Sequence, residues 1–181
     1  MKRIALLITL LLLTSCSGKS PVTTPAITPG EVIGCESVPR DSSITKGIYV
    51  ECLDGTTGVM LGALRGPMIL NVWGSWCTTC LDEMPEFRSF YEKAKGKVQL
   101  VGVDVEEPNP EAGQAFVVAQ GITWPNFYDR ENVTRGFFGM GVPVTWFIDE
   151  SGEAVFKKIG VIKSEKELID LTHKHLGIHI S

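Results

Sequence analysis

The sequence lacks several features that mark common classes of protein. Its 181 residues carry a formal net charge of −4 and no arginine-rich or lysine-rich stretch, which argues against a nucleic-acid partner. The longest predominantly apolar run, residues 4–13, is about half the ~20 residues that a membrane-spanning helix needs. No glycine-rich nucleotide loop is present. Only three histidines occur, all near the C-terminus, so we expect neither a metal site nor a resident cofactor.

The first fifteen residues are typical of an export signal. Lys2 and Arg3 give a positively charged start, and the apolar run follows them. Leu13-Thr14-Ser15-Cys16 then resembles the lipobox of bacterial lipoproteins, in which the cysteine becomes the lipid-modified first residue. The resemblance implies a signal peptide over residues 1–15 and a lipid anchor at Cys16, on the extracytoplasmic face of a bacterial membrane. A secretory peptide that is cleaved without lipidation is the alternative.

The next segment, residues 16–34, is rich in Ser, Thr, Pro and Gly and has few large apolar side chains. Such a composition buries too little surface to offset the entropy lost on folding. We therefore predict a flexible, lipid-anchored linker over residues 16–34. One folded domain should follow over residues 35–181, a length that suits a single hydrophobic core.

Strand and helix patterns alternate along this domain. Short β-branched or apolar runs bounded by turn residues predict strands, and apolar residues at helical spacing predict helices. The expected strands are 48–53, 67–73, 98–105, 126–128, 144–148 and 154–159, and the expected helices are 78–93, 110–120, 133–138 and 164–175. The last two strands, joined by a Glu-Ser-Gly turn, should form an antiparallel hairpin. Together the elements predict an α/β sandwich with helices on both faces of a mixed or parallel sheet.

A Cys-X-X-Cys motif, Cys77-Thr78-Thr79-Cys80, lies directly after a buried strand and at the start of a helix. Residues three apart in the first helical turn lie on one face, so the two sulfur atoms can reach disulfide geometry. The free amide groups and the positive end of the helix dipole stabilise a thiolate at this position. We therefore expect Cys77 to be the attacking nucleophile and Cys80 to resolve the mixed disulfide formed with a substrate.

A Cys-X-X-Cys motif can also bind zinc or form a structural disulfide. A zinc half-site needs two more ligands, and the chain has no second Cys-X-X-Cys motif. A purely structural disulfide between the two cysteines is a second alternative. A peroxidase of the peroxiredoxin type is disfavoured, because such enzymes carry Thr or Ser three residues before the reactive cysteine, where this chain has Gly74.

The number of cysteines predicts a second disulfide. Five cysteines in an exported protein leave one unpaired, and lipidation of Cys16 leaves four. In an oxidising compartment we expect Cys77 to pair with Cys80 and Cys35 with Cys52. The second pair would close a loop of about 15 to 20 residues and contribute ~3 kcal/mol in the chain-entropy model. The alternative is that Cys35 and Cys52 are small buried thiols.

The stretch from Asn71 to Pro85, with Trp-Gly-Ser-Trp before the first cysteine of the motif and Glu-Met-Pro after the second, resembles the TlpA/ResA-like branch of the thioredoxin superfamily. Further matching stretches follow in the family's order: Val101–Asp104, Gly121–Pro125, Tyr128–Asp129 and Gly141–Asp149. The resemblance implies a thioredoxin-like three-layer sandwich with an inserted helix and strand between about residues 106 and 129. It also implies an extracytoplasmic thiol-disulfide oxidoreductase.

The same resemblance assigns roles to residues outside the cysteine pair. It implies a cis Val142–Pro143 bond that sets Pro143 against the disulfide, with the Val142 backbone pairing with an extended substrate segment. We expect Trp76 to share in substrate binding. Glu83 would adjust the active-site thiols and shuttle the proton that Cys80 loses. The alternatives are a trans proline opening an edge strand, and a solvated helix glutamate.

Three functions fit these observations. The favoured one is a reductant that passes electrons to exported proteins, as in cytochrome c maturation, and that needs a membrane electron donor. The second is an oxidant that forms disulfides in exported thiols and needs an electron acceptor. The third, a non-enzymatic lipoprotein that binds copper or a partner, is weakest because the chain has no histidine before His173 to place against the cysteines.

Overall fold

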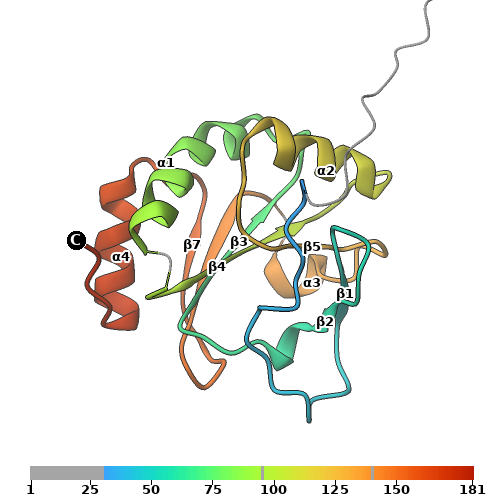
Figure 1. Cartoon of the computed structure of the whole chain (residues 1–181), viewed down its shortest axis with the longest axis horizontal. Coiled ribbons are helices and arrows are strands. Elements are labelled where there is room, and N and C mark those ends of the chain that lie inside the picture. Colours follow the sequence, from blue (N-terminus) through green and yellow to red (C-terminus); the bar gives the residue numbers. More distant parts are fainter. Residues whose placement is uncertain (1–30, 95, 140) are drawn as a thin grey trace, which may run out of the picture.

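The computed structural model describes residues 31–94, 96–139 and 141–181. The expected signal peptide, Cys16 and most of the expected linker lie outside the described residues. Figure 1 shows a twisted central sheet with helices packed around it. No helix in the described ranges is both long enough and apolar enough to cross a membrane.

Within these ranges, seven strands form one mixed sheet in the order β2-β1-β5-β4-β3-β6-β7. The strands are β1 (Tyr49–Cys52), β2 (Val59–Met60), β3 (Met68–Trp73), β4 (Gln99–Asp104), β5 (Asn126–Tyr128), β6 (Val144–Ile148) and β7 (Ala154–Ile159). β3, β4 and β5 are parallel neighbours, whereas β6 runs antiparallel to β3 and forms the expected hairpin with β7. The six predicted strands are confirmed. The two-residue β2 was not predicted, because so short a segment carries no periodicity.

In the described part of the chain, four α-helices cover the sheet: α1 (Thr78–Ala94), α2 (Pro110–Ala119), α3 (Arg135–Phe138) and α4 (Glu165–Leu176). In Figure 1, α1 and α2 arch over the sheet and α4 lies beside α1, while the short α3 lies on the opposite side. The 3-10 helix η1 (Leu61–Ala63) packs in the same apolar cluster as α3. The thioredoxin-like three-layer sandwich is therefore confirmed, with α2 and β5 as the inserted helix and strand.

The central strand β3 packs against side chains on both faces of the sheet. All six of its residues are buried, as expected for a strand covered on both faces. Ile69 and Trp73 pack against the helices α1, α2 and α4, whereas Leu70 and Val72 pack in the opposite cluster with Phe138 of α3. This alternation fixes which face the end of β3 presents to the following turn.

Side-chain caps determine where two of the helices begin. The Ser164 hydroxyl accepts a hydrogen bond from the Glu167 amide (3.1 Å) and starts α4, as its sequence pattern predicts. Asn109 does the same for α2 by accepting from the Ala112 amide (3.2 Å). α1 runs through Pro85 and buries Met84 and other apolar side chains against the sheet. The caps thus fix the first residues of α2 and α4.

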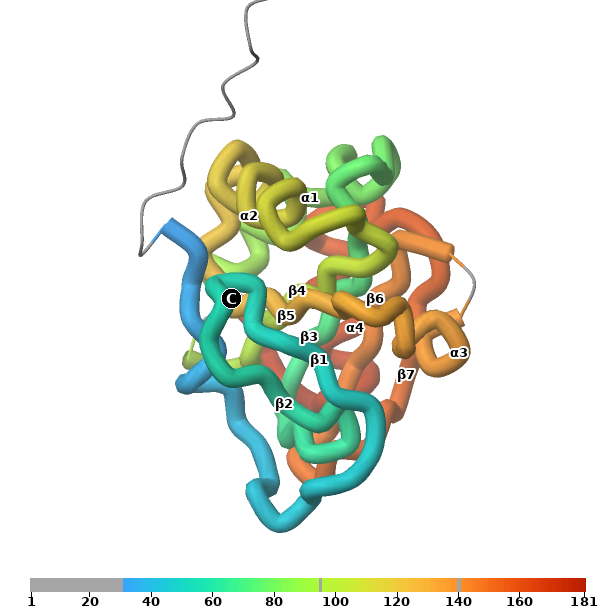
Figure 2. Tube along the Cα trace, turned by 90° about the vertical axis from the view of Figure 1, so that its right-hand side faces the viewer, coloured from blue at the N-terminus to red at the C-terminus, as the bar shows by residue number. Residues whose placement is uncertain are grey.

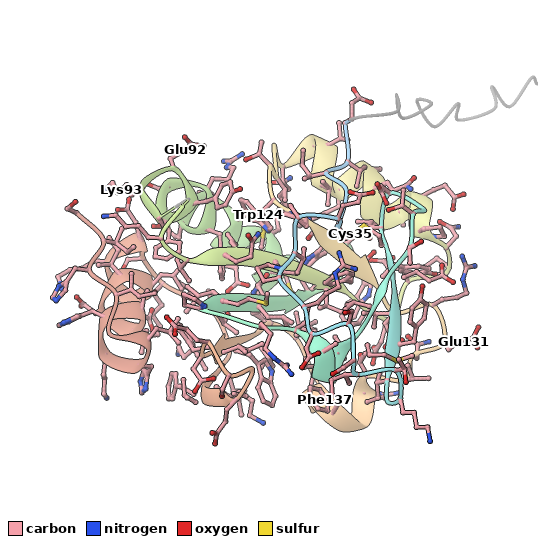
Figure 3. All side chains as sticks on the ribbon, turned by 60° about the horizontal axis from the view of Figure 1, so that its bottom comes forward. Cys35, Glu92, Lys93, Trp124, Glu131 and Phe137 are labelled. Atoms are coloured by element: carbon pink, nitrogen blue, oxygen red, sulfur yellow. A yellow bond between two sulfur atoms is a disulfide. The ribbon has the colours of Figure 1, made fainter. Side chains whose placement is uncertain are left out.

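The segment before β1 belongs to the folded body from Val32 onward, because Val32 packs in the helix-side cluster with only 7% of its surface exposed. Cys35 and Cys52 form a buried disulfide, with Cα atoms 5.9 Å apart. Figure 2 shows this N-terminal segment running alongside β1 and β2, and Figure 3 labels Cys35. The disulfide ties the chain that follows the expected linker to the strand β1.

Candidate active site

The Cys-X-X-Cys motif lies where β3 passes into α1. β3 ends at Trp73, a tight turn follows, and Cys77 and Cys80 form a disulfide with Cα atoms 5.2 Å apart. The Cys80 amide donates a hydrogen bond to Cys77 Sγ (3.1 Å). The same amide also donates to the Cys77 carbonyl oxygen at 3.1 Å. An amide of the first helical turn thus faces the sulfur, the kind of contact that stabilises a thiolate.

The two sulfurs differ in access and in neighbours. Cys77 keeps 5% of its surface exposed, whereas Cys80 is fully buried. The Thr79 hydroxyl lies 3.4 Å from Cys77 Sγ and can donate to it. An incoming group therefore meets Cys77 first, and Cys80 can act only from behind it.

Trp76 forms the exposed wall beside the disulfide, with 53% of its surface accessible. Its indole lies over Gly74, where an added Cβ would come within 2.6 Å of Trp76 Nε1. A larger residue at position 74 would displace the indole. The glycine that separates this chain from the peroxiredoxin pattern thus has a packing role here.

Glu83 is fully buried one turn after Cys80. Its Oε1 accepts from Asn71 Nδ2 (2.9 Å) on β3, and its Oε2 accepts from the Ile162 amide (2.9 Å) after β7. Burial raises the pKa of Glu83 to about 7, and the two hydrogen bonds oppose part of that rise. The carboxyl can therefore take up or release a proton near neutral pH, beside the face of α1 that carries Cys80.

The Val142–Pro143 bond is cis, and Pro143 is buried at the start of β6. The Pro143 carbonyl accepts from the Gly160 amide (3.0 Å), which fixes this loop to the end of β7. Val142 stays partly exposed and lines two recesses, one towards Trp76 and one towards Ile159 of β7. Val142 thus lies at the surface between these two recesses.

The recess beside Trp76 has an apolar floor made by Val72, Val105 and Phe138. Its rim carries an ion pair between Arg135 and Glu106, with N and O atoms 3.4 Å apart. Figure 3 shows the neighbouring Phe137 on α3, which leaves 48% of its surface exposed. The recess is therefore apolar at its floor, with the Arg135–Glu106 pair at its rim and the buried Asp129 also among its lining residues.

Two further carboxyls lie beneath the redox turn and were not singled out from the sequence. Asp104 ends β4 in register with Trp73 and is fully buried, and Glu107 is buried in the loop that follows. Glu107 Oε1 accepts from the Ser75 amide at 2.5 Å. The sequence does indicate that Asp104 is unusual. It is an aspartate in an otherwise apolar strand, and ionised groups are rarely buried without a partner.

In the described ranges, no three His, Cys, Asp or Glu side chains are grouped so that they could hold a metal ion. The nearest approach of two histidines is His173 with His179, whose ring centroids are 4.0 Å apart. These two rings are exposed at the C-terminal end of the chain.

Comparison with known proteins places this geometry in a family. The family model described as the AhpC/TSA family matches residues 46–157, a span that contains the redox turn, the buried carboxyls and the Val142–Pro143 bond. The chain belongs to the AhpC/TSA family. Within this family, thiol-disulfide oxidoreductase ResA of Bacillus thuringiensis is 35% identical over 105 residues, covering 56% of this chain and 60% of that protein.

Two further comparisons support the same branch of the AhpC/TSA family. Sporulation thiol-disulfide oxidoreductase A of Bacillus subtilis is 31% identical over 102 residues, or 54% of this chain and 62% of the relative. The chain thus spans about 60% of the length of these curated relatives. The crystal structure of StoA from Bacillus subtilis aligns with a TM-score of 0.58 and 26% identity, over 69% of this chain and 95% of that one. The ResA-like resemblance and the thioredoxin-like fold are confirmed.

Proposed function

We propose that this chain is a thiol-disulfide oxidoreductase that exchanges disulfides with exported proteins through Cys77 and Cys80. The observation that carries the proposal is the position of the disulfide. It lies at the start of α1, with the Cys80 amide on Cys77 Sγ at 3.1 Å and a buried, titratable Glu83 one turn further on. The names of the ResA and StoA relatives support the same reaction.

In the reductive direction, the Cys77 thiolate attacks one sulfur of a substrate disulfide and forms a mixed disulfide, while the other substrate sulfur leaves as a thiolate. Cys80 then loses its proton and attacks Cys77 Sγ, which releases the second substrate thiol and closes the Cys77–Cys80 disulfide. Two electrons pass to the substrate. Glu83 accepts the proton of Cys80, because its pKa of about 7 suits proton transfer near neutral pH.

Substrate binding is assigned to the surface around Val142 and Trp76. The substrate backbone pairs with Val142, and an apolar side chain enters the recess floored by Val72 and Phe138. Backbone pairing accepts many sequences, whereas the recess favours segments with an apolar residue near the cysteine. Pro143 closes this surface against the disulfide.

We place the protein in the cell envelope, at the extracytoplasmic face of a membrane and anchored through a lipid on Cys16 after removal of residues 1–15. Residues from position 16 to the start of the folded body would act as the tether. The reductant needs a membrane electron donor to restore the two thiols. Reduction of exported apoproteins, as in cytochrome c biogenesis, is the favoured role, and disulfide formation by the oxidised pair is the alternative.

Trapping the reaction intermediate tests this function. A Cys80→Ser variant should accumulate a mixed disulfide between Cys77 and a disulfide-containing protein, visible by non-reducing electrophoresis and lost on adding dithiothreitol. Cys77→Ser should give none. Equal trapping by both variants would contradict the assigned order of attack, and no trapping by either would contradict the function.

A further inference from the structure

Asp104 has an unusual environment for a carboxyl group. It is fully buried, and neither of its oxygens accepts a hydrogen bond from an N–H or hydroxyl group in the described part of the chain. The carboxyl of Glu107 is its neighbour and adds to the rise in the pKa of Asp104. Two carboxyls can share a hydrogen bond only when one of them holds a proton.

The backbone of α2 packs closely against this carboxyl. Gly113 of α2 lies directly above it, and a Cβ at that position would come within 1.8 Å of Asp104 Oδ2. On the other side, the Trp73 indole stacks on Phe116 of α2 with ring centroids 4.7 Å apart. The helix α2 and the end of β3 therefore close over Asp104 and keep water from replacing its single partner.

Glu107 extends this contact to the redox turn. Its Oε1 accepts from the Ser75 amide at 2.5 Å, and Ser75 is two residues before Cys77. A proton on Asp104 would join its carboxyl, the Glu107 carboxyl and the Ser75 amide in one chain of hydrogen bonds. A carboxylate that accepts from both sides is held more firmly than one that accepts from the amide alone.

We propose that Asp104 is a positioning residue for the redox turn, acting as a neutral acid that donates to Glu107, which in turn holds the Ser75 amide. The involvement of this turn in catalysis rests on the function proposed above, whereas the hydrogen-bond chain itself does not. When Asp104 loses its proton, two buried carboxylates face each other without a donor. Glu107 then moves away from the Ser75 amide, and the turn that presents Cys77 loosens.

The groups that face Asp104 come from β3, β5, α2 and the loop that carries Glu107. Burial, followed by the nearby Glu107 carboxyl, raises the pKa of Asp104 to about 9. From β5, burial also raises the pKa of Tyr128 above its ordinary value, so this phenol stays neutral while Asp104 titrates. Arg130 and Glu51 lie beyond Tyr128 as an exposed ion pair. The residues that contact Asp104 from β3 and α2, Trp73 and Gly113, carry no charge.

A nuclear magnetic resonance titration of the oxidised full chain in detergent micelles, from pH 6 to pH 10.5, tests the hydrogen-bond chain. We expect the side-chain carboxyl carbon of Asp104 and the amide proton of Ser75 to shift together, with one midpoint in the alkaline range. In Asp104→Asn, whose amide still donates to Glu107, the Ser75 resonance should not move. An Asp104 already ionised at pH 6, or a Ser75 resonance that ignores its titration, would overturn the proposal. This readout needs no catalysis, so it is independent of the proposed function.

The consequence for the thiol is tested by alkylation of Cys77 in the reduced protein. Asp104→Asn should react within about twofold of the wild type at pH 7 and keep its rate up to pH 10. Above pH 9, the alkylation rate of the wild type should drop below that of Asp104→Asn by roughly threefold to tenfold. This is the effect expected when a charge-assisted hydrogen bond is lost. Superimposable wild-type and Asp104→Asn profiles would contradict the proposal. Asp104→Leu should be slower at every pH, but the asparagine variant alone decides if the leucine variant does not fold.

Discussion

Glu83 and Asp104 are both buried near the start of the redox helix, and they differ in their hydrogen-bond partners. Both Glu83 and Asp104 are fully buried on the helix side of the sheet. Glu83 accepts two hydrogen bonds of 2.9 Å from neutral donors, Asn71 Nδ2 and the Ile162 amide. Asp104 has no such donor and faces the carboxyl of Glu107.

The different hydrogen-bond partners give Glu83 and Asp104 different roles. Donors that favour the charged form leave the pKa of Glu83 at about 7, where the group can exchange a proton during turnover. Burial without such donors, together with the neighbouring Glu107 carboxyl, raises the pKa of Asp104 to about 9, so it stays neutral at physiological pH and can donate. Burial alone therefore does not set the role of an acid, because the hydrogen-bonding partners decide which form is retained.

The largest effect should come from the nucleophilic cysteine. Cys77→Ser should lose disulfide exchange by more than about a thousandfold, because a hydroxyl is not ionised at this pH and cannot attack a disulfide. Turnover of a model protein disulfide with dithiothreitol as electron donor measures it. Cys35→Ala with Cys52→Ala is the matched control, since it removes the other disulfide and should keep the activity if the domain stays folded.

Replacing the exchangeable carboxyl should have the next largest effect. Glu83→Gln should slow exchange by roughly tenfold to hundredfold and remove the step in the pH–rate profile near pH 7, because an amide cannot accept the Cys80 proton. Asp82→Asn is the control, since Asp82 is the exposed neighbour on the same helix. A wild-type profile in Glu83→Gln would mean that the buried glutamate is only structural.

The pH dependence of stability should separate the two carboxyls. The folded protein raises the pKa of Glu83 from 4.5 to about 7 and that of Asp104 from 3.8 to about 9, so between those values it binds more protons than the unfolded chain. The free energy of unfolding must then fall as pH rises through each window, by at most ~1.4 kcal/mol per pH unit for each group. Asp104→Asn should flatten the decline between pH 7 and pH 9, whereas Glu83→Gln should flatten only the decline below pH 7. Urea denaturation of the oxidised proteins measures both, and identical curves for the two variants would remove the distinction.

The tight packing over Asp104 predicts a smaller loss. Gly113→Ala places a Cβ within 1.8 Å of Asp104 Oδ2, so α2 must shift, at a cost of about 1 to 3 kcal/mol in the free energy of unfolding. Gly136→Ala on α3 is the matched control, because its Cβ would meet nothing within 4 Å. Thermal unfolding compares the two, and an equal response at both positions would contradict the close contact.

The smallest effect should come from a neutral neighbour of the nucleophile. Thr79→Val keeps the shape of the side chain but removes the hydroxyl that lies 3.4 Å from Cys77 Sγ. We expect the rate of Cys77 alkylation at pH 6 to fall by about twofold to threefold, because a weak donor to the thiolate is lost. Thr78→Val, which alters the adjacent exposed hydroxyl, should leave that rate unchanged.

Local pattern was enough to predict most of the fold, because the elements are long or have clear periodicity. Strands β5, β6 and β7 begin and end where the sequence predicts, and α4 starts at its Ser164 cap. The position of the Cys-X-X-Cys motif at a strand-to-helix junction follows from the same patterns. β2 was missed because its pairing with β1 depends on tertiary contacts.

The polar half of the site was harder to predict. Glu83 could be placed on the face of Cys80 by helical spacing, but its bonds to Asn71 and Ile162 join segments far apart in the chain. The Asp104–Glu107 pair depends on the register of β3 against β4, which no local pattern determines. An acid within an apolar strand was the one visible sign of it.

The most direct test of the account is the reduction potential of the Cys77–Cys80 pair, measured at pH 7 on the full chain by equilibration with dithiothreitol or glutathione buffers and trapping of free thiols. A value near or below that of thioredoxin, about −270 mV, is predicted for a reductant of exported proteins. A value close to that of DsbA, about −120 mV, would contradict it and make the protein an oxidant of exported thiols.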